Sequence, residues 1–223
     1  MNNGYVLSVP KYESINTTMV YYYVKRVFDI LISLIGLLIL LPLTLIVKLS
    51  YLLSGDTNTV FFRHKRIGKD GKYIYLWKFR TMYPNAESSL QKILAENPEL
   101  KAEWDKNQKL DHDPRVTKIG RILRKTSLDE FPQFINILKG EMSLIGPRPV
   151  IDGEIEKYGK NKAKFLSMKP GLTGYWQANG RSDTNYRNRI KLELYYVDHF
   201  SFALDMEIFF KTFFVVALQK GAK

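Results

Sequence analysis

Two adjacent carboxylates, Asp129 and Glu130, lie in a stretch whose residue types favour phosphate chemistry. Arg124 precedes them, and Arg148 follows between two prolines in the sequence RKTSLDEFPQFINILKGEMSLIGPRP, residues 124–149. Guanidinium groups bind phosphate bidentately, and flanking prolines restrict the backbone around Arg148. A carboxylate can act as a nucleophile and carry a phosphoryl group, and neighbouring acids can hold Mg²⁺. The stretch therefore predicts phosphoryl transfer with arginines as phosphate ligands.

The same acids also fit a plain structural interpretation. Ser127 and Glu130 have the spacing of a capping box, and apolar residues follow at helical spacing at Phe131, Phe134, Ile135 and Leu138. With Ser127 as the cap, the missing N–H of Pro132 would matter, whereas with Asp129 as the cap Pro132 falls in the first turn. Either alternative puts Asp129 at a helix start, where free amides favour anions. Both acids could simply begin a helix.

Composition limits the kind of protein. The chain has 223 residues, enough for one domain, and 34 Lys and Arg against 22 Asp and Glu, a formal charge of +12. That charge predicts anionic partners, namely anionic lipid, nucleic acid or phosphorylated small molecules. The absence of cysteine excludes disulfides and thiolate chemistry, and the three histidines have no metal-binding spacing.

Residues 30–53, ILISLIGLLILLPLTLIVKLSYLL, predict a membrane segment. Pro42 lies near the middle and breaks or kinks a helix, leaving arms of about 18 Å against a hydrocarbon core of roughly 30 Å. Cationic residues flank both ends, at Lys25, Arg26, Arg63, Lys65, Arg66 and Lys69. Because positive flanks favour the cytoplasm, we expect a re-entrant helix hairpin over residues 25–57. A spanning helix and a buried helix of a soluble protein are the alternatives.

The remaining patterns predict a mainly α protein with a small β-hairpin, an α+β fold. Aromatic runs on both sides of the turn at residues 69–72 predict the hairpin, and Lys78 and Arg80 share one strand face, which could equally be a solvated face. Helices follow between residues 85 and 113. We expect a polar segment over residues 1–24, the membrane hairpin over residues 25–57 and a membrane-associated domain over residues 58–223.

Two segments in the C-terminal part of the chain each have two interpretations. The turn at Gly180-Arg181 could cradle a ligand or only connect elements. Residues 208–218 are almost wholly apolar, with Lys211 as the one charge, too short to span a bilayer. They fit either an interfacial amphipathic helix or a core helix, and the membrane hairpin upstream favours the interface.

Three motifs together resemble the bacterial sugar transferase family. They are KFRTM at residues 78–82, DPRVTKIGRILRKTSLDEFPQFINILKGEMSLIGPRP at residues 113–149, and KPGLTGYWQANGR at residues 169–181. The family comprises monotopic polyprenyl-phosphate phosphoglycosyl transferases, which begin capsule, O-antigen and exopolysaccharide assembly. The resemblance extends over about residues 24–218, and its hexose-1-phosphate branch is the more similar.

The resemblance implies Mg²⁺-dependent transfer of a sugar 1-phosphate from a UDP-sugar to undecaprenyl phosphate, with release of UMP. On matching positions, Asp129 would attack the β-phosphate and form a phosphosugar–enzyme intermediate, and Glu130 would assist metal binding or proton transfer. Both acids would hold the metal. Arg124 and Arg148 would bind phosphate, and Lys78, Arg80 and Arg181 are further candidate substrate ligands.

The resemblance also implies a protein at the cytoplasmic face of the bacterial inner membrane, anchored from one side. Its partners would be the UDP-sugar, undecaprenyl phosphate and membrane lipid, and nucleic acid is not expected. A homo-oligomer is possible. Three departures stand out: the helix break is Leu41-Pro42 where the family often has Ser-Pro, Glu193 replaces an aspartate of many relatives, and the multi-span region of some relatives is expected to be absent.

Two rival functions remain at this stage. Asp129 could act as a base in a direct, single-displacement transfer. Alternatively, the chain could be a non-catalytic basic membrane protein that binds anionic lipid or nucleic acid through its charge and interleaved aromatics. The second rival leaves the paired acids and Arg148 unexplained.

Overall fold

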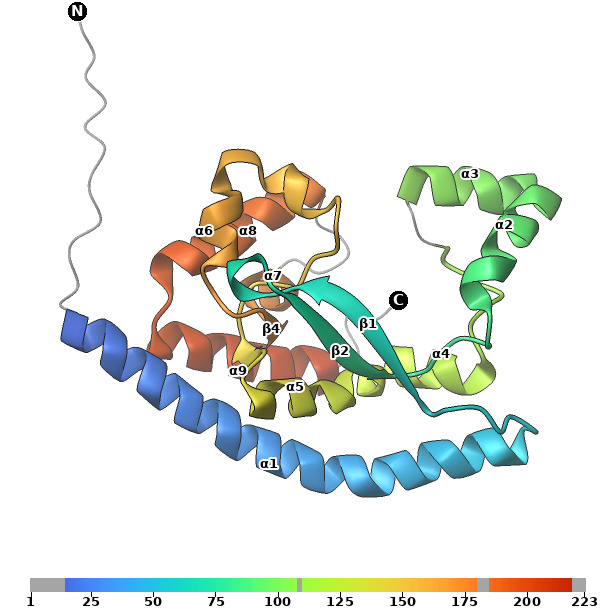
Figure 1. The fold of residues 1–223 in the computed structure, drawn as a ribbon, viewed down its shortest axis with the longest axis horizontal. Coiled ribbons are helices and arrows are strands. Elements are labelled where there is room, and N and C mark those ends of the chain that lie inside the picture. The colour runs from blue at the N-terminus through green and yellow to red at the C-terminus, as the bar shows by residue number, and fades with distance from the viewer. Residues whose placement is uncertain (1–14, 108–109, 180–184, 218–223) are drawn as a thin grey trace, which may run out of the picture.

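A long curved helix, α1 (Ile15–Leu53), forms one side of the molecule, and the rest of the chain lies along its concave edge (Figure 1). The computed structural model describes residues 15–107, 110–179 and 185–217. Helices curve around the core they cover, with the convex side facing outward. The curvature of α1 follows this rule, with the hairpin, α5 and α9 on its inner side.

The two faces of α1 have opposite chemistry. Residues three, four or seven apart form the buried stripe, which is polar in its first half: Lys25, Asp29, Ser33, Gly36, Leu40, Val47 and Tyr51. The outward face carries exposed aliphatic residues along most of the length of the helix, including Leu31, Leu38, Leu45 and Leu52. Residues 19–53 are long and apolar enough to cross a membrane by length and composition. An apolar surface of this extent indicates a partner for the helix, either lipid or protein.

Pro42 does not interrupt α1. The helix continues through this residue, so the predicted division into two helices at Pro42 is wrong for the structure. The hydroxyls of Thr44 and Ser50 donate to the carbonyls of Leu40 and Ile46, four residues earlier. Such bonds give carbonyl oxygens near the proline a second donor. Whether the helix enters and leaves the membrane on one side stays a prediction.

The β-hairpin is confirmed. Strands β1 (Phe61–Ile67) and β2 (Tyr73–Phe79) pair antiparallel around a one-turn 3-10 helix, η1 (Lys69–Gly71). One hairpin face carries cations over aromatic rings, with Arg63 above Tyr75 and Lys65 above Tyr73. The other face is directed into the molecule. A second, parallel pair joins β3 (Ser143–Ile145) to β4 (Gly171–Thr173).

The helices divide into an isolated pair and a main group. α2 (Ala86–Glu96) and α3 (Pro98–Asn107) stand apart at one end of the molecule in Figure 1. The main group surrounds the sheets and consists of α4 (Lys118–Lys125), η2 (Leu128–Gln133), α5 (Phe134–Lys139), η3 (Ile155–Asn161), α6 (Lys162–Leu166), α7 (Tyr175–Asn179), α8 (Tyr186–His199) and α9 (Phe202–Ala217).

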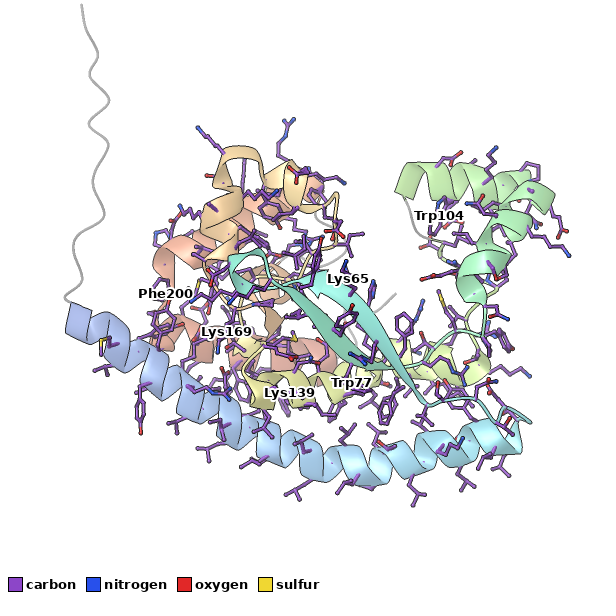
Figure 2. The ribbon with its side chains drawn as sticks, in the orientation of Figure 1. Lys65, Trp77, Trp104, Lys139, Lys169 and Phe200 are labelled. Carbon is purple, nitrogen blue, oxygen red and sulfur yellow. The ribbon has the colours of Figure 1, made fainter. Side chains whose placement is uncertain are left out.

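Close packing fixes α1 against the main group. A Cβ on Gly36 would lie 2.5 Å from the Phe134 ring, so glycine permits α1 to approach α5. Nearer the start of α1, the Lys25 ammonium lies 2.6 Å from a carboxylate oxygen of Asp205 in α9. Figure 2 shows Phe200 beside the same end of α1, where its ring contacts Tyr21. The mainly helical α+β class is therefore confirmed. An interfacial position for α9 stays a prediction.

Candidate active site

The turn that carries the two acids differs from the predicted helix start. Residues 128–133 form the 3-10 helix η2, and the α-helix begins only at Phe134. Ser127 adopts a left-handed conformation, with φ of 57°, and its hydroxyl makes no capping bond, so the capping box is wrong. Pro132 lies inside η2, two residues before the α-helix begins, so its missing N–H falls outside the α-helix. Asp129 does lie in the first turn of a helix, as predicted.

Glu130 is held by Lys78 from the hairpin. The Lys78 ammonium donates to Glu130 Oε1 at 2.6 Å, with the two side chains 20% and 31% exposed. Lys78 and Arg148 hold the pKa of Glu130 below its usual range although burial opposes them. Glu130 is therefore ionised at neutral pH and restrained in position, which explains why its side chain does not return to cap the turn.

Asp129 has the opposite electrostatic character. Burial and the neighbouring charge of Glu130 raise the pKa of Asp129 to about 6, against the lowering effect of Lys78 and Arg124. Within the part of the chain that the structure describes, no side chain donates a hydrogen bond to this carboxylate, and the residue's own backbone N–H supplies a weak one. A carboxylate that is poorly solvated and poorly hydrogen-bonded keeps its oxygen lone pairs available.

Arg124 reaches the site from α4. Thr117 caps this helix, its hydroxyl accepting from the Gly120 amide at 2.8 Å, and a Cβ on Gly120 would lie 2.0 Å from the Thr81 carbonyl oxygen. This close approach brings the Arg124 Nε to within 2.9 Å of the Thr81 hydroxyl. The remaining N–H groups of the guanidinium have no protein acceptor among the described residues and are available to an anion.

Arg148 reaches the site from the loop after β3. Its backbone N–H donates to Glu193 Oε2 of α8 at 2.8 Å, which fixes the loop between the two prolines. Its guanidinium lies 5.6 Å from the Trp176 ring and pairs with no carboxylate among the described residues. Burial raises the pKa of Glu193 to about 7, although Arg189 and Arg148 counter that effect. Glu193 thus holds the backbone of the loop that carries Arg148.

The other predicted site residues do not present free charged groups to the site among the described residues. Arg80 donates to the carbonyls of Thr59 and Met82 and pairs with Asp56 at 2.8 Å, so its guanidinium is engaged in the scaffold although its side chain borders the same cleft. Arg181 lies outside the described residues. Pro42 lies within α1, at its most exposed apolar face.

One cleft of about 1270 Å³ brings the acids and the free cations together. Asp129, Glu130, Lys78, Arg124 and Arg148 all border it. One end extends beneath the α2–α3 pair, where Figure 2 shows Trp104, and the other end reaches α9. The structure thus collects six predicted site residues, Arg80 included, around a single cavity, in which a carboxylate lies close to cations that could bind phosphate.

Several cleft residues were missed by the sequence analysis. His64 and Arg66 project from β1 into the cleft, on the face opposite the cation–aromatic pairs, and Trp176 borders it from α7. Burial and the nearby cations Arg66, Lys78 and Arg148 lower the pKa of His64 to about 4, so it is neutral at physiological pH. The alternation of side chains along β1 contained this information, but only together with knowledge of which face is covered.

A metal site made by the protein alone is not evident. Among the described residues, no three carboxylate or histidine groups gather where they could hold a metal. Mg²⁺ is commonly bound by one or two carboxylates together with substrate phosphates and water. Asp129 and Glu130 fit that partial ligand set, with the remaining ligands supplied by a bound phosphorylated substrate.

Several known proteins are similar in sequence to this chain. A family model described as bacterial sugar transferase matches residues 20–219. The exopolysaccharide production protein ExoY of Sinorhizobium fredii is 43% identical over 198 residues, which cover 89% of this chain and 87% of that protein. The undecaprenyl-phosphate galactose phosphotransferase of Salmonella typhimurium is 43% identical over 200 residues, or 90% of this chain.

A third relative is the UDP-glucose:undecaprenyl-phosphate glucose-1-phosphate transferase of Escherichia coli, 38% identical over 206 residues that cover 89% of this chain. The chain spans only 42% of the Salmonella protein and 41% of the E. coli protein. The matched region includes the hairpin, both acids and the loop of Arg148.

Proposed function

Because the chain belongs to the bacterial sugar transferase family, we propose that it transfers a hexose 1-phosphate from a UDP-hexose to undecaprenyl phosphate and releases UMP. The observation that carries the proposal is the cleft in which the Asp129 carboxylate lies near two guanidinium groups, Arg124 and Arg148, that pair with no carboxylate among the described residues. A diphosphate donor and a lipid phosphate both need such cations. The names of the relatives, which specify galactose and glucose, support a hexose.

The first step is an attack of an Asp129 carboxylate oxygen on the β-phosphorus of the donor. A bond forms between that oxygen and phosphorus, and the bond from phosphorus to the bridging oxygen of the diphosphate breaks. UMP leaves with the electron pair, and the hexosyl phosphate stays on Asp129 as an acyl phosphate. Arg124 and Arg148 stabilise the charge on the phosphate oxygens during the step.

The second step restores the enzyme. A phosphate oxygen of the lipid acceptor attacks the same phosphorus, and the bond between phosphorus and the Asp129 oxygen breaks. The carboxylate is regenerated and the lipid carries hexose through a diphosphate. Lys78 keeps Glu130 ionised and in place, so that Glu130 can orient a metal or the incoming phosphate throughout both steps.

Asp129 and Glu130 would hold Mg²⁺ together with the donor phosphates. When bound, the ion neutralises diphosphate charge and makes UMP a better leaving group. The chain's own cations, Arg124 and Arg148, would bind and orient the donor phosphates, because they border the cleft beside the acids.

The site works at the cytoplasmic face of the bacterial inner membrane, with α1 as a one-sided anchor, and the product begins capsule, exopolysaccharide or O-antigen synthesis. The exposed apolar face of α1 and the cations on both of its flanks support this arrangement. Single cysteines placed before Lys25 and after Arg63, in a chain with no native cysteine, test it. Labelling of one end only from outside intact cells would indicate a spanning helix.

The activity itself is tested by UMP release. Membranes containing the protein, undecaprenyl phosphate and a panel of UDP-hexoses should release UMP with at least one hexose, and membranes without the protein should not. No release with any common UDP-hexose would refute the proposal and favour a non-catalytic anion-binding protein.

A further inference from the structure

The two ends of the cleft differ in chemistry. At the α9 end, the wall is built from apolar side chains of η2, α5, β3, β4 and α9, namely Phe131, Phe134, Leu144, Leu172, Phe209 and Phe213. Thr173 and Thr212 are polar residues there, and their hydroxyls lie 2.8 Å apart, so they bond to each other. Gln177 of α7 also borders the cleft. The charged residues that border the cleft lie toward its centre and its α2–α3 end. An apolar wall next to a phosphate site fits an amphiphilic ligand.

The apolar end also lies next to the helix that carries the exposed aliphatic face. Phe209 of α9 packs edge-on against Phe28 of α1, with ring centroids 5.5 Å apart. A ligand that leaves the cleft past α9 therefore emerges beside α1 rather than beside the distant α2–α3 pair (Figure 1). The cleft thus connects the catalytic acid to the surface that is proposed to face lipid.

We propose that this α9 end of the cleft is the binding groove for the first isoprene units of the lipid acceptor, with Phe213 as an acceptor-specific contact. The inference rests on the proposed function. The lipid phosphate would sit between Arg124 and Arg148 beside Asp129, and the chain attached to it would run along the phenylalanine wall. Charge at one end and apolar surface at the other match the two parts of a polyprenyl phosphate.

The exposure of Phe213 distinguishes a ligand contact from core packing. Its side chain is 65% exposed, so it contributes little to the folded core, yet it borders the cleft. Its neighbour Phe214 is 62% exposed on the same helix and does not border the cleft. The two phenylalanines therefore form a matched pair with equal exposure and different positions relative to the groove.

The experiment compares Phe213→Ala with Phe214→Ala. Loss of an apolar contact of phenylalanine size should raise the KM for undecaprenyl phosphate about tenfold in Phe213→Ala. The KM for the UDP-hexose and the amount of UMP released without acceptor should stay at the wild-type values. Phe214→Ala should match the wild type in all three measurements, after the membrane-bound amounts of the variants are equalised.

A shortened acceptor provides the second measurement. With a soluble phosphate that carries one or two isoprene units, the wild type should have a raised KM, and Phe213→Ala should raise that KM further. An equal KM for the long acceptor in both variants and the wild type would overturn the groove while leaving the transferase proposal intact.

Direct labelling keeps the inference testable even without turnover. A photoreactive isoprenyl phosphate should label the α9 peptide, residues 202–217, and excess undecaprenyl phosphate should suppress that label. Labelling confined to peptides of α2 and α3 would place the acceptor at the other end of the cleft. Absence of UMP release by the wild type would count against the proposed function, and the photolabelling result alone would then decide whether the α9 end binds an isoprenyl phosphate.

Discussion

Two lysine–carboxylate pairs with the same separation have different roles in this protein. Lys78 and Glu130 lie 2.6 Å apart at the edge of the cleft, and Lys25 and Asp205 lie 2.6 Å apart where α1 meets α9. The side chains of the first pair are 20% and 31% exposed, and those of the second pair are 10% and 2% exposed. Distance alone therefore does not distinguish a site from a structural junction.

The surroundings of each pair make the distinction. At the junction, Asp205 accepts from Tyr21, Lys25 and Tyr196, so both carboxylate oxygens are bonded. In the cleft, the pair restrains Glu130 but leaves Asp129 beside it with a raised pKa. Complete hydrogen bonding stabilises a buried charge, and incomplete bonding leaves a charge that can react. The predictions below test that contrast, from the largest expected effect to the smallest.

Replacing Asp129 should separate activity from stability most strongly. Asp129→Asn removes the proposed nucleophile, and we expect kcat/KM for UMP release to fall by about 10³-fold or more. The same change removes a carboxyl whose pKa is raised in the folded state, and so should increase the free energy of unfolding at pH 7 by about 1–3 kcal/mol. Activity assays and denaturant unfolding in detergent measure the two effects.

The sign of the stability gain follows from proton binding. Between pH 4 and about 6 the folded protein holds a proton on Asp129 that the unfolded chain releases, so native stability falls as pH rises through this window. The advantage of Asp129→Asn should thus disappear below pH 4. A variant that is inactive and also less stable at pH 7 would contradict the account of an under-bonded carboxylate.

Replacing Asp205 should have the reverse outcome. Asp205→Ala removes the ion-pair partner of the buried Lys25 ammonium, which should cost about 3–5 kcal/mol of unfolding free energy. The activity of each folded molecule should change little, because Asp205 does not border the cleft. Glu207→Ala on the same helix is the control, since its ion pair with Lys211 is exposed and should be worth less than about 0.5 kcal/mol.

The two cations of the KFRTM motif should respond differently to the same substitution. Lys78→Met frees Glu130 and should lower kcat/KM about 10- to 100-fold with little loss of stability. Arg80→Met removes bonds to Thr59, Met82 and Asp56 and should cost about 2–4 kcal/mol of stability. If Lys78→Met were the less stable of the two variants, the assignment of their roles would be reversed.

The pH dependence of the rate should follow Asp129. Because a protonated carboxyl is not a nucleophile, kcat/KM should fall about tenfold per pH unit below about 6 and level off above it. Lys78 lowers the pKa of Asp129, so Lys78→Met should raise that pKa. The decline in kcat/KM should then begin at a higher pH than in the wild type. A profile that is flat down to pH 4.5 would show that Asp129 is not the group whose ionisation limits the rate.

The sequence predicted the components of the site better than their support. Asp129, Glu130, Arg124 and Arg148 were recognisable from residue types and from the prolines beside Arg148, and Lys78 from the motif. Lys78 and Arg80 could not be told apart, because both follow the same strand alternation. Their difference arises after Phe79, where β2 ends and Arg80 turns to bond the carbonyl of Thr59.

Tertiary contacts explain the other differences. The capping box failed because Glu130 has a stronger partner in Lys78, which lies 52 residues away along the chain. The helix break at Pro42 was expected from local chemistry. The structure instead has one continuous helix, α1, whose buried side packs against the rest of the molecule. In the sequence, Asp205 is simply an acidic residue before an apolar C-terminal stretch. No local sequence pattern predicts its ion pair with Lys25, which lies near the other end of the chain.

Trapping the intermediate tests the central claim most directly. Purified protein mixed with its UDP-hexose but no lipid acceptor should carry one hexosyl phosphate on the peptide that contains Asp129, by mass spectrometry. The adduct should disappear when undecaprenyl phosphate is added, and Asp129→Asn should never form it. Turnover with acceptor but no adduct at any time, together with residual activity of Asp129→Asn, would contradict a covalent role for Asp129 and favour direct transfer.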